Sequence, residues 1–120
     1  MDTSKKNLRL PMDTIKQLIP DMGGCYASDR ILVDGLPVGF MYRIKPTHVK
    51  DSGWRFMGGD ETQAYLDDPK NWAIYEVNVV CNNDPSIIPY LQAVPGSAFG
   101  RAKSSNKFEP EPLPPDPDQV

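Results

Sequence analysis

Hydrophobic and polar residues alternate in several short runs of the chain, which predicts a sheet of short strands. The run LPVGFMYRI, at 36–44, has side chains that alternate between two faces, which is typical of a half-buried antiparallel strand. One face carries Val38, Phe40, Tyr42 and Ile44, and the other carries Gly39, Met41, Arg43 and Lys45. The run CYASDRILV precedes it, and Asp34-Gly35 between the two suits a type I′ turn. The pattern therefore predicts a central Asp-Gly β-hairpin.

Three later runs also predict strands. WRFM, at 54–57, places Trp54 and Phe56 on the core side and Arg55 and Met57 on the other side. NWAIYEVNVV begins as a strand, although a helical turn over 77–81 fits the spacing equally well. A last strand is expected around SAFGR, at 97–101.

Short helices are expected between the strands. Asp13 can cap a helix whose apolar residues Ile15, Leu18 and Ile19 share one face before Pro20 ends it. Asp60 with Gln63 resembles a capping box that opens a helix through Leu66. Asp84 followed by Pro85 predicts a helix start, and Pro89 limits this helix to one or two turns.

Strands interrupted by short helices indicate an α+β fold with a mainly antiparallel sheet. At 120 residues the chain has room for one domain, which we expect at 11–101. Residues 1–10 are polar and predict a flexible N-terminal segment. Residues 102–120 hold five of the thirteen prolines and few apolar side chains, which predicts a disordered, proline-rich acidic tail.

Charge and composition narrow the function. The chain has 13 basic and 16 acidic residues, a net charge of -3, so it lacks the basic surface that nucleic-acid binding needs. No run approaches the roughly 20 apolar residues that span a bilayer, and the polar start does not resemble a secretory signal. Cys25 and Cys81 are far apart and belong to no metal-binding or redox motif. We therefore expect a cytoplasmic protein with two reduced, buried thiols, no nucleic-acid or membrane partner and no cofactor.

Reactive chemistry has little support in the sequence. His48 as a general base, with Asp51, Asp60 or Glu61 as its partner, has the right residue types without a recognised spacing. Five carboxylates could supply oxygen ligands to a hard cation, but their spacing matches no calcium loop: Asp51, Asp60, Glu61, Asp67 and Asp68. The amides of Gly58 and Gly59 could bind an anion, although we expect the carboxylate of Asp60 to occupy them. The sequence therefore predicts neither an enzyme nor a metal site.

Aromatic and arginine side chains offer a binding surface instead. Trp54 is expected in the core, where its indole N–H finds an acceptor. Arg55 is expected to face outward with Tyr42, Arg43 and Arg30 near it, which is the composition that dominates protein interfaces. Trp54, Arg55 and Tyr42 could alternatively line the pocket of a small-molecule or regulatory binding module.

Four long blocks of the chain resemble a known family. They are CYASDRILVDGLPVGFMYRIKP, DSGWRFMGGDETQAYLDDPKN, AIYEVN and NDPSIIPYLQAVPGSAFGR, and together they cover about residues 24–101. They resemble a bacterial family first catalogued as a domain of unknown function and later assigned to immunity proteins of polymorphic toxin systems, of the type numbered thirty-three. The matching motif positions include Gly35, Gly39, Gly53, Trp54, Phe56, Gly59, Asp84 and Pro85.

The resemblance implies a small α+β protein that binds and neutralises a cognate protein toxin. It brings no catalytic residue. Tight occlusion of a partner suits a chain without a reactive constellation, and acidic loops would attract a basic toxin. The expected partner contacts are Tyr42, Arg55, Asp60, Glu61, Asp67 and Asp68.

Overall fold

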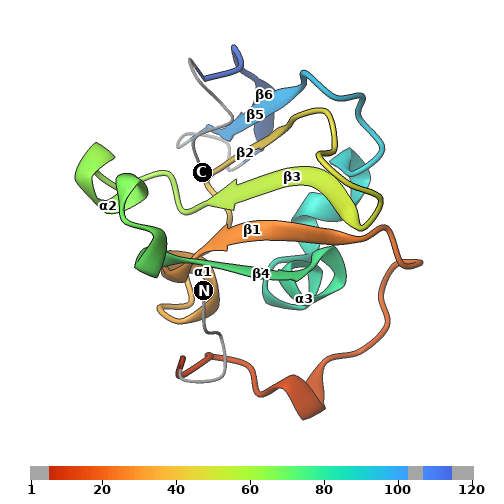
Figure 1. Ribbon diagram of the computed structural model, residues 1–120, viewed down its shortest axis with the longest axis vertical. Helices are drawn as coiled ribbons and strands as arrows, with labels where there is room; N and C mark the ends of the chain where they lie inside the picture. Colours follow the sequence, from red (N-terminus) through yellow and green to blue (C-terminus); the bar gives the residue numbers. More distant parts are fainter. Residues whose placement is uncertain (1–5, 103–106, 115–120) are drawn as a thin grey trace.

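The computed structural model describes residues 6–102 and 107–114, which form one six-stranded sheet with short helices (Figure 1). The strands are β1 (Gly24–Ser28), β2 (Phe40–Arg43), β3 (Asp51–Met57), β4 (Trp72–Glu76), β5 (Ala98–Arg101) and β6 (Phe108–Pro110). The helices are η2 (Met12–Thr14), α1 (Asp29–Leu32), α2 (Gln63–Asp67), η3 (Pro69–Asn71), α3 (Val77–Asn83) and η4 (Pro85–Tyr90). The α+β class is thus confirmed.

The strand order is β4-β1-β3-β2-β5-β6, and the sheet is mixed. β1 and β3 run parallel in its centre, whereas their outer neighbours pair antiparallel. The prediction of a mainly antiparallel sheet is therefore wrong. The parallel pair arises because the chain passes through α1 and β2 before β3 returns to lie beside β1.

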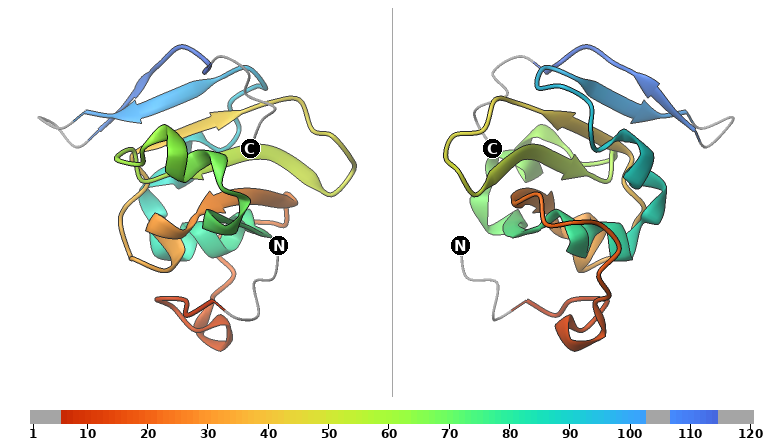
Figure 2. Two further views of the ribbon diagram at one scale, coloured as in Figure 1. Left: turned by 60° about the vertical axis from the view of Figure 1, so that its left-hand side comes forward. Right: turned by 90° about the vertical axis from the view of Figure 1, so that its right-hand side faces the viewer.

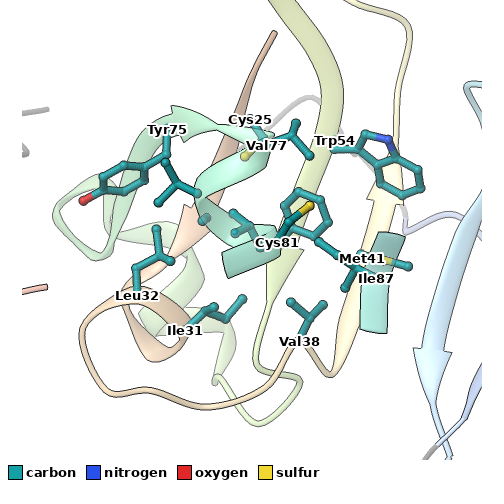
Figure 3. Packing of buried hydrophobic residues seen from close by; sticks show 14 of the residues in the cluster. Cys25, Ile31, Leu32, Val38, Met41, Trp54, Tyr75, Val77, Cys81 and Ile87 are labelled. Carbon is teal, nitrogen blue, oxygen red and sulfur yellow. The ribbon is translucent and has the colours of Figure 1, made fainter. Parts of the chain in front are cut away.

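Both faces of the sheet are packed. On one face, α1, α3 and η4 cover the main core, which includes Trp54, Phe56 and Met41 from the strands (Figures 2 and 3). The other face carries a second cluster of Tyr42, Ile44, Met57, Trp72 and Ala98, against which Leu66 of α2 packs. β2 is therefore buried on both sides rather than half-buried.

The Asp-Gly hairpin predicted at 34–35 is not formed. Ser28 caps α1 by accepting a hydrogen bond from the N–H of Arg30, so the chain leaves β1 as a helix. Gly35 has φ +84° and its N–H donates to the carbonyl of Ile31, so its left-handed backbone ends that helix instead of turning a hairpin. β3 then separates β1 from β2 in the sheet.

The predicted segment 72–90 is confirmed in detail. The run begins as β4 and becomes α3 at Val77, so both interpretations of its spacing are correct for different parts. Pro85 opens η4, which ends at Tyr90 after two short turns. Strands at 54–57 and 98–101 also lie where the sequence places them.

The predicted helix over 13–19 is wrong beyond the single turn of η2. Two asparagines of α3 hold the segment instead. The side-chain oxygen of Asn78 accepts from the N–H of Leu18 at 2.8 Å, and its amide donates to the carbonyl of Lys16 at 2.8 Å. Asn82 accepts from the N–H of Lys16 at 3.0 Å. These hydrogen bonds satisfy backbone N–H and C=O groups of the segment that a helix would otherwise satisfy, so the segment stays extended beyond η2.

The two ends of the domain also differ from expectation. Residues 6–10 contact the domain, since the Lys6 ammonium lies 2.7 Å from Asp29 and the Arg9 N–H donates to the carbonyl of Leu32. Residues 108–110 form β6 on β5, so the predicted disorder is wrong there, because the buried Phe108 ring anchors the strand. Residues 1–5, 103–106 and 115–120 of the two predicted flexible segments lie outside the described residues.

Candidate partner-binding surface

The structure gathers exposed carboxylates around α2, at the end of the sheet where β1 and β3 terminate. We call this group the α2 acidic surface: the exposed Asp34, Asp60, Asp67 and Asp68 and the half-buried Glu61. The helix begins at a Thr62 cap, whose hydroxyl accepts from the N–H of Tyr65. The indole N–H of Trp72 donates to the carbonyl of Leu66 at 2.8 Å and fixes the helix to the sheet. The helix is confirmed, but its cap is Thr62 rather than Asp60.

Glu61 closes the glycine loop that follows β3. Its carboxylate accepts from the N–H of Gly58 at 2.7 Å and from the N–H of Gly59 at 2.8 Å. The amides considered for an anion are thus occupied by Glu61, not by Asp60. The loop also needs Gly39, because a Cβ there would overlap the carbonyl oxygen of Gly58.

Asp60 instead pairs with Arg30 of α1. The guanidinium lies 2.5 Å from Asp60 and 2.9 Å from Asp34, so one cation links two exposed carboxylates. The hydrogen bond from Arg30 holds the pKa of Asp60 below its ordinary value. The i, i+4 spacing of Arg30 and Asp34 was a signal that could have located this pair in the sequence.

The pKa of Tyr65 responds to the negative charges of this surface. Its partial burial raises the pKa of the phenol, a hydrogen bond with Ser28 opposes this, and the nearby charges of Asp29, Asp34 and Glu61 raise it further. Three carboxylates from α1, the helix end and the glycine loop therefore act on one hydroxyl. Arg30 balances only part of this charge, so the surface has a negative potential.

Asp67 and Asp68 lie at the far end of α2. Asp67 accepts a hydrogen bond from the exposed side chain of Gln63 at 2.8 Å. Asp68 caps η3 by accepting from the N–H of Lys70 at 2.9 Å. The structure thus brings four of the predicted contact residues, Asp60, Glu61, Asp67 and Asp68, to the two ends of one short helix.

The other two predicted contact residues are buried. Tyr42 and Arg55 each expose only 3% of their surface. Arg55 pairs with Asp51 at 3.0 Å and lies over the Tyr26 ring, with the guanidinium carbon 4.7 Å from the ring centroid. Arg55 is therefore an internal residue of the sheet and not an outward-facing contact.

The small-molecule pocket expected from Trp54, Arg55 and Tyr42 is not formed. Trp54 is in the main core, where it stacks on Phe56, whereas Arg55 and Tyr42 lie on the opposite face of the sheet. The Trp54 indole N–H donates to the carbonyl of Leu91 at 3.1 Å, which confirms its predicted role as a core residue.

The arrangement offers no partner for His48 as a catalytic base. His48 is exposed in the loop before β3, and the Asp51 carboxylate is occupied by Arg55, Thr47 and the N–H of Gly53. Asp60 and Glu61 follow the opposite end of β3, about 20 Å away at the usual rise per residue. Within residues 6–102 and 107–114, no three His, Cys, Asp or Glu side chains are grouped so that they could hold a metal ion.

The described chain is thus a small α+β domain with carboxylates grouped around α2. The chain belongs to the immunity protein Imm33 domain family, whose model matches residues 25–110. No curated protein and no solved structure matches it. Among the described helices, none has the length and apolar character needed to cross a membrane.

Proposed function

We propose that this protein is a cytoplasmic bacterial immunity protein that binds and neutralises a cognate toxin through the α2 acidic surface. The family membership over residues 25–110 carries the proposal, because immunity proteins act by binding a toxin. The exposed carboxylates around α2 supply a surface for a basic partner.

Inhibition by occlusion needs affinity and fast association rather than a reactive group. Like-charged side chains at the rim of an interface steer an oppositely charged partner and raise the association rate. Three of the carboxylates are held in place before the partner arrives. Ion pairs with Arg30 hold Asp34 and Asp60, and hydrogen bonds from backbone N–H groups hold Glu61. This order lowers the entropy that binding costs.

The proposal is tested with the toxin domain encoded beside this gene. Co-expression of the two proteins should restore growth, and the purified pair should form a stable complex. Asp67→Lys reverses a charge whose only described hydrogen bond is to exposed Gln63, so the fold should persist. We expect this variant to slow association about tenfold at low salt, measured by stopped-flow mixing.

Glu109→Lys is the matched control, because Glu109 is an exposed carboxylate on β6 at the other side of the sheet. It should associate at the wild-type rate. If the wild-type protein neither binds nor restores growth, the toxin-neutralising role is rejected. If both variants behave as wild type, the α2 acidic surface is not the contact.

A further inference from the structure

A cavity lies between the N-terminal segment and the edge of the sheet. The segment at 6–22 forms an arc beside β4 and α3 (Figure 1). The cavity is open to solvent and has a volume of about 820 Å³, within the range of ligand-binding pockets. One wall carries Leu8, Met12 and Ile15 from the arc, and the other carries Ile74, Tyr75 and Val79 from β4 and α3.

The wall formed by β4 contains a buried hydroxyl without a partner. Tyr75 exposes 8% of its surface, and its hydroxyl makes no hydrogen bond to any residue within 6–102 and 107–114. Figure 3 shows this hydroxyl pointing away from the centre of the hydrophobic cluster. A buried polar atom without a partner is costly, so it marks a place where a ligand can supply one.

The same strand presents an unpaired backbone. β4 is an edge strand of the described sheet, and just beyond its end the N–H of Val77 donates to the carbonyl of Gly23, the residue before β1. In an antiparallel ladder the bonded residues alternate, so the N–H and C=O of Ile74 point away from β1. Within the described chain, no backbone group of a loop forms a hydrogen bond with this N–H or C=O. The Ile74 side chain is also 54% exposed.

The available charge at this cavity is negative. The exposed carboxylate of Glu76 makes no hydrogen bond or ion pair in the part of the chain that the structure describes. Lys6 also lines the cavity, but its ammonium is held by Asp29 and by the carbonyl of Lys70. A ligand therefore meets one unbalanced carboxylate beside an apolar wall.

The cavity is held open by the hydrogen bonds that fix the arc. Asn78 binds Leu18 and Lys16, and Asn82 adds a second pair of bonds to the backbone of Lys16. Lys16 and Leu18 flank Gln17, which itself lines the cavity. A site that exists before the ligand arrives loses less entropy on binding.

We propose that the edge of β4 takes up an extended segment of the partner protein, which adds a strand at Ile74 and places a basic side chain beside Glu76. Backbone bonds at a sheet edge give affinity in such complexes, and adjacent side chains give selectivity. The hydroxyl of Tyr75 then hydrogen-bonds to the inserted segment. This inference rests on the proposed function, since the partner is the toxin domain.

The site is continuous with the α2 acidic surface. β4 starts at Trp72, which holds α2 in place, and reaches Glu76 about 13 Å further along. One partner can therefore contact the carboxylates of α2 and the edge of β4 together.

The test measures binding of the full chain to the toxin domain encoded beside its gene. Glu76→Arg should weaken the complex about tenfold or more, because it places a cation opposite the basic side chain. Ile74→Pro removes the outward N–H, which an edge strand tolerates, and should weaken binding about fivefold to tenfold. Glu109→Arg, on the opposite edge strand, should bind as wild type. Hydrogen exchange should show the Ile74 amide protected only in the complex.

The outcomes separate the two proposals. If the wild-type protein does not bind, the toxin-neutralising role fails and the strand addition falls with it. If wild type binds, but Glu76→Arg binds equally well and the Ile74 amide stays unprotected, the strand addition alone is wrong. The exchange measurement uses the wild-type protein, so it tests the strand addition even if Ile74→Pro does not fold. Sedimentation of the free protein as a dimer with a protected Ile74 amide would also overturn it, because a second copy would then occupy the edge.

Discussion

The carboxylate of Asp84 lies 2.7 Å from the guanidinium of Arg101 and joins η4 to β5. The same carboxylate accepts from the N–H of Val38 at 2.9 Å, while Arg101 donates to the carbonyl of Val38. Asp84 also caps η4 by accepting from the N–H of Ser86. The helix start predicted from Asp84-Pro85 is therefore also the point where three distant segments are joined.

Replacing Asp84 should destabilise the protein strongly. Asp84→Ala leaves Arg101 and the Val38 N–H without this partner in a mostly buried site, which costs about 3 kcal/mol. Chemical denaturation monitored by tryptophan fluorescence measures the loss. Asp34→Ala removes one carboxylate of an exposed pair and should cost less than about 1 kcal/mol. Equal losses in the two variants would contradict the structural role of Asp84.

The Asp51–Arg55 pair should make stability depend on acid pH. Burial alone would raise the pKa of Asp51, but hydrogen bonds from Arg55, Gly53 and Thr47 hold it below its ordinary value. The unfolded carboxyl has a pKa of about 3.9, so the stabilisation is present above about pH 4 and is lost as the pH falls further. The free energy of unfolding should therefore fall less steeply from pH 5 to pH 2 in Asp51→Asn. Parallel curves for the two proteins would exclude this pair as the cause.

The two thiols should be unreactive in the native protein. Cys25 and Cys81 expose 1% and 0% of their surface. Burial raises the pKa of Cys25 well above its ordinary value and, with the charge of Asp84 nearby, that of Cys81 to about 11. A thiol-specific chromogenic reagent at pH 8 should react with neither until denaturant is added, after which both should react. A fast reaction in native buffer would show that a thiol is accessible.

Asn78 should control the order of the N-terminal arc. Asn78→Ala removes the acceptor of the Leu18 N–H and the donor to Lys16, so both backbone groups lose a partner. Hydrogen exchange at Leu18 should accelerate about tenfold or more. Asn83→Ala is the comparison, because the amide of Asn83 donates to Val79 inside α3. Unchanged exchange at Leu18 in Asn78→Ala would show that other contacts hold the arc.

Local patterns predicted the structure where neighbouring residues decide it. The alternation of Trp54 and Phe56 with Arg55 gave the correct faces of β3. The helical turn left open over 77–81 lies within α3. The hairpin prediction at Asp34-Gly35 was wrong because this dipeptide indicates only a positive φ at Gly35. A positive φ ends a helix as readily as it forms a hairpin turn.

Long-range contacts decided the rest. The helix over 13–19 is replaced by bonds to Asn78, some 60 residues later, which no local pattern reveals. Arg55 was expected to face outward because it alternates with the core residues Trp54 and Phe56, yet its face is covered and Asp51 pairs with it there. Asp51 and Arg55 are four residues apart in β3, so their side chains lie on the same face of the strand. This spacing could have predicted their ion pair from the sequence.

The arc and the edge of β4 have different relations to the family. The match begins at residue 25, so the wall carrying Leu8, Met12 and Ile15 lies outside the family domain, whereas Ile74 and Tyr75 lie within it. Substitutions at Leu8, Met12 or Ile15 would reshape the cavity from outside the matched residues, whereas Ile19 of the same arc is part of the main core. If the edge of β4 binds the partner as proposed, changes in these three residues would alter recognition between related proteins without any change in the matched residues 25–110.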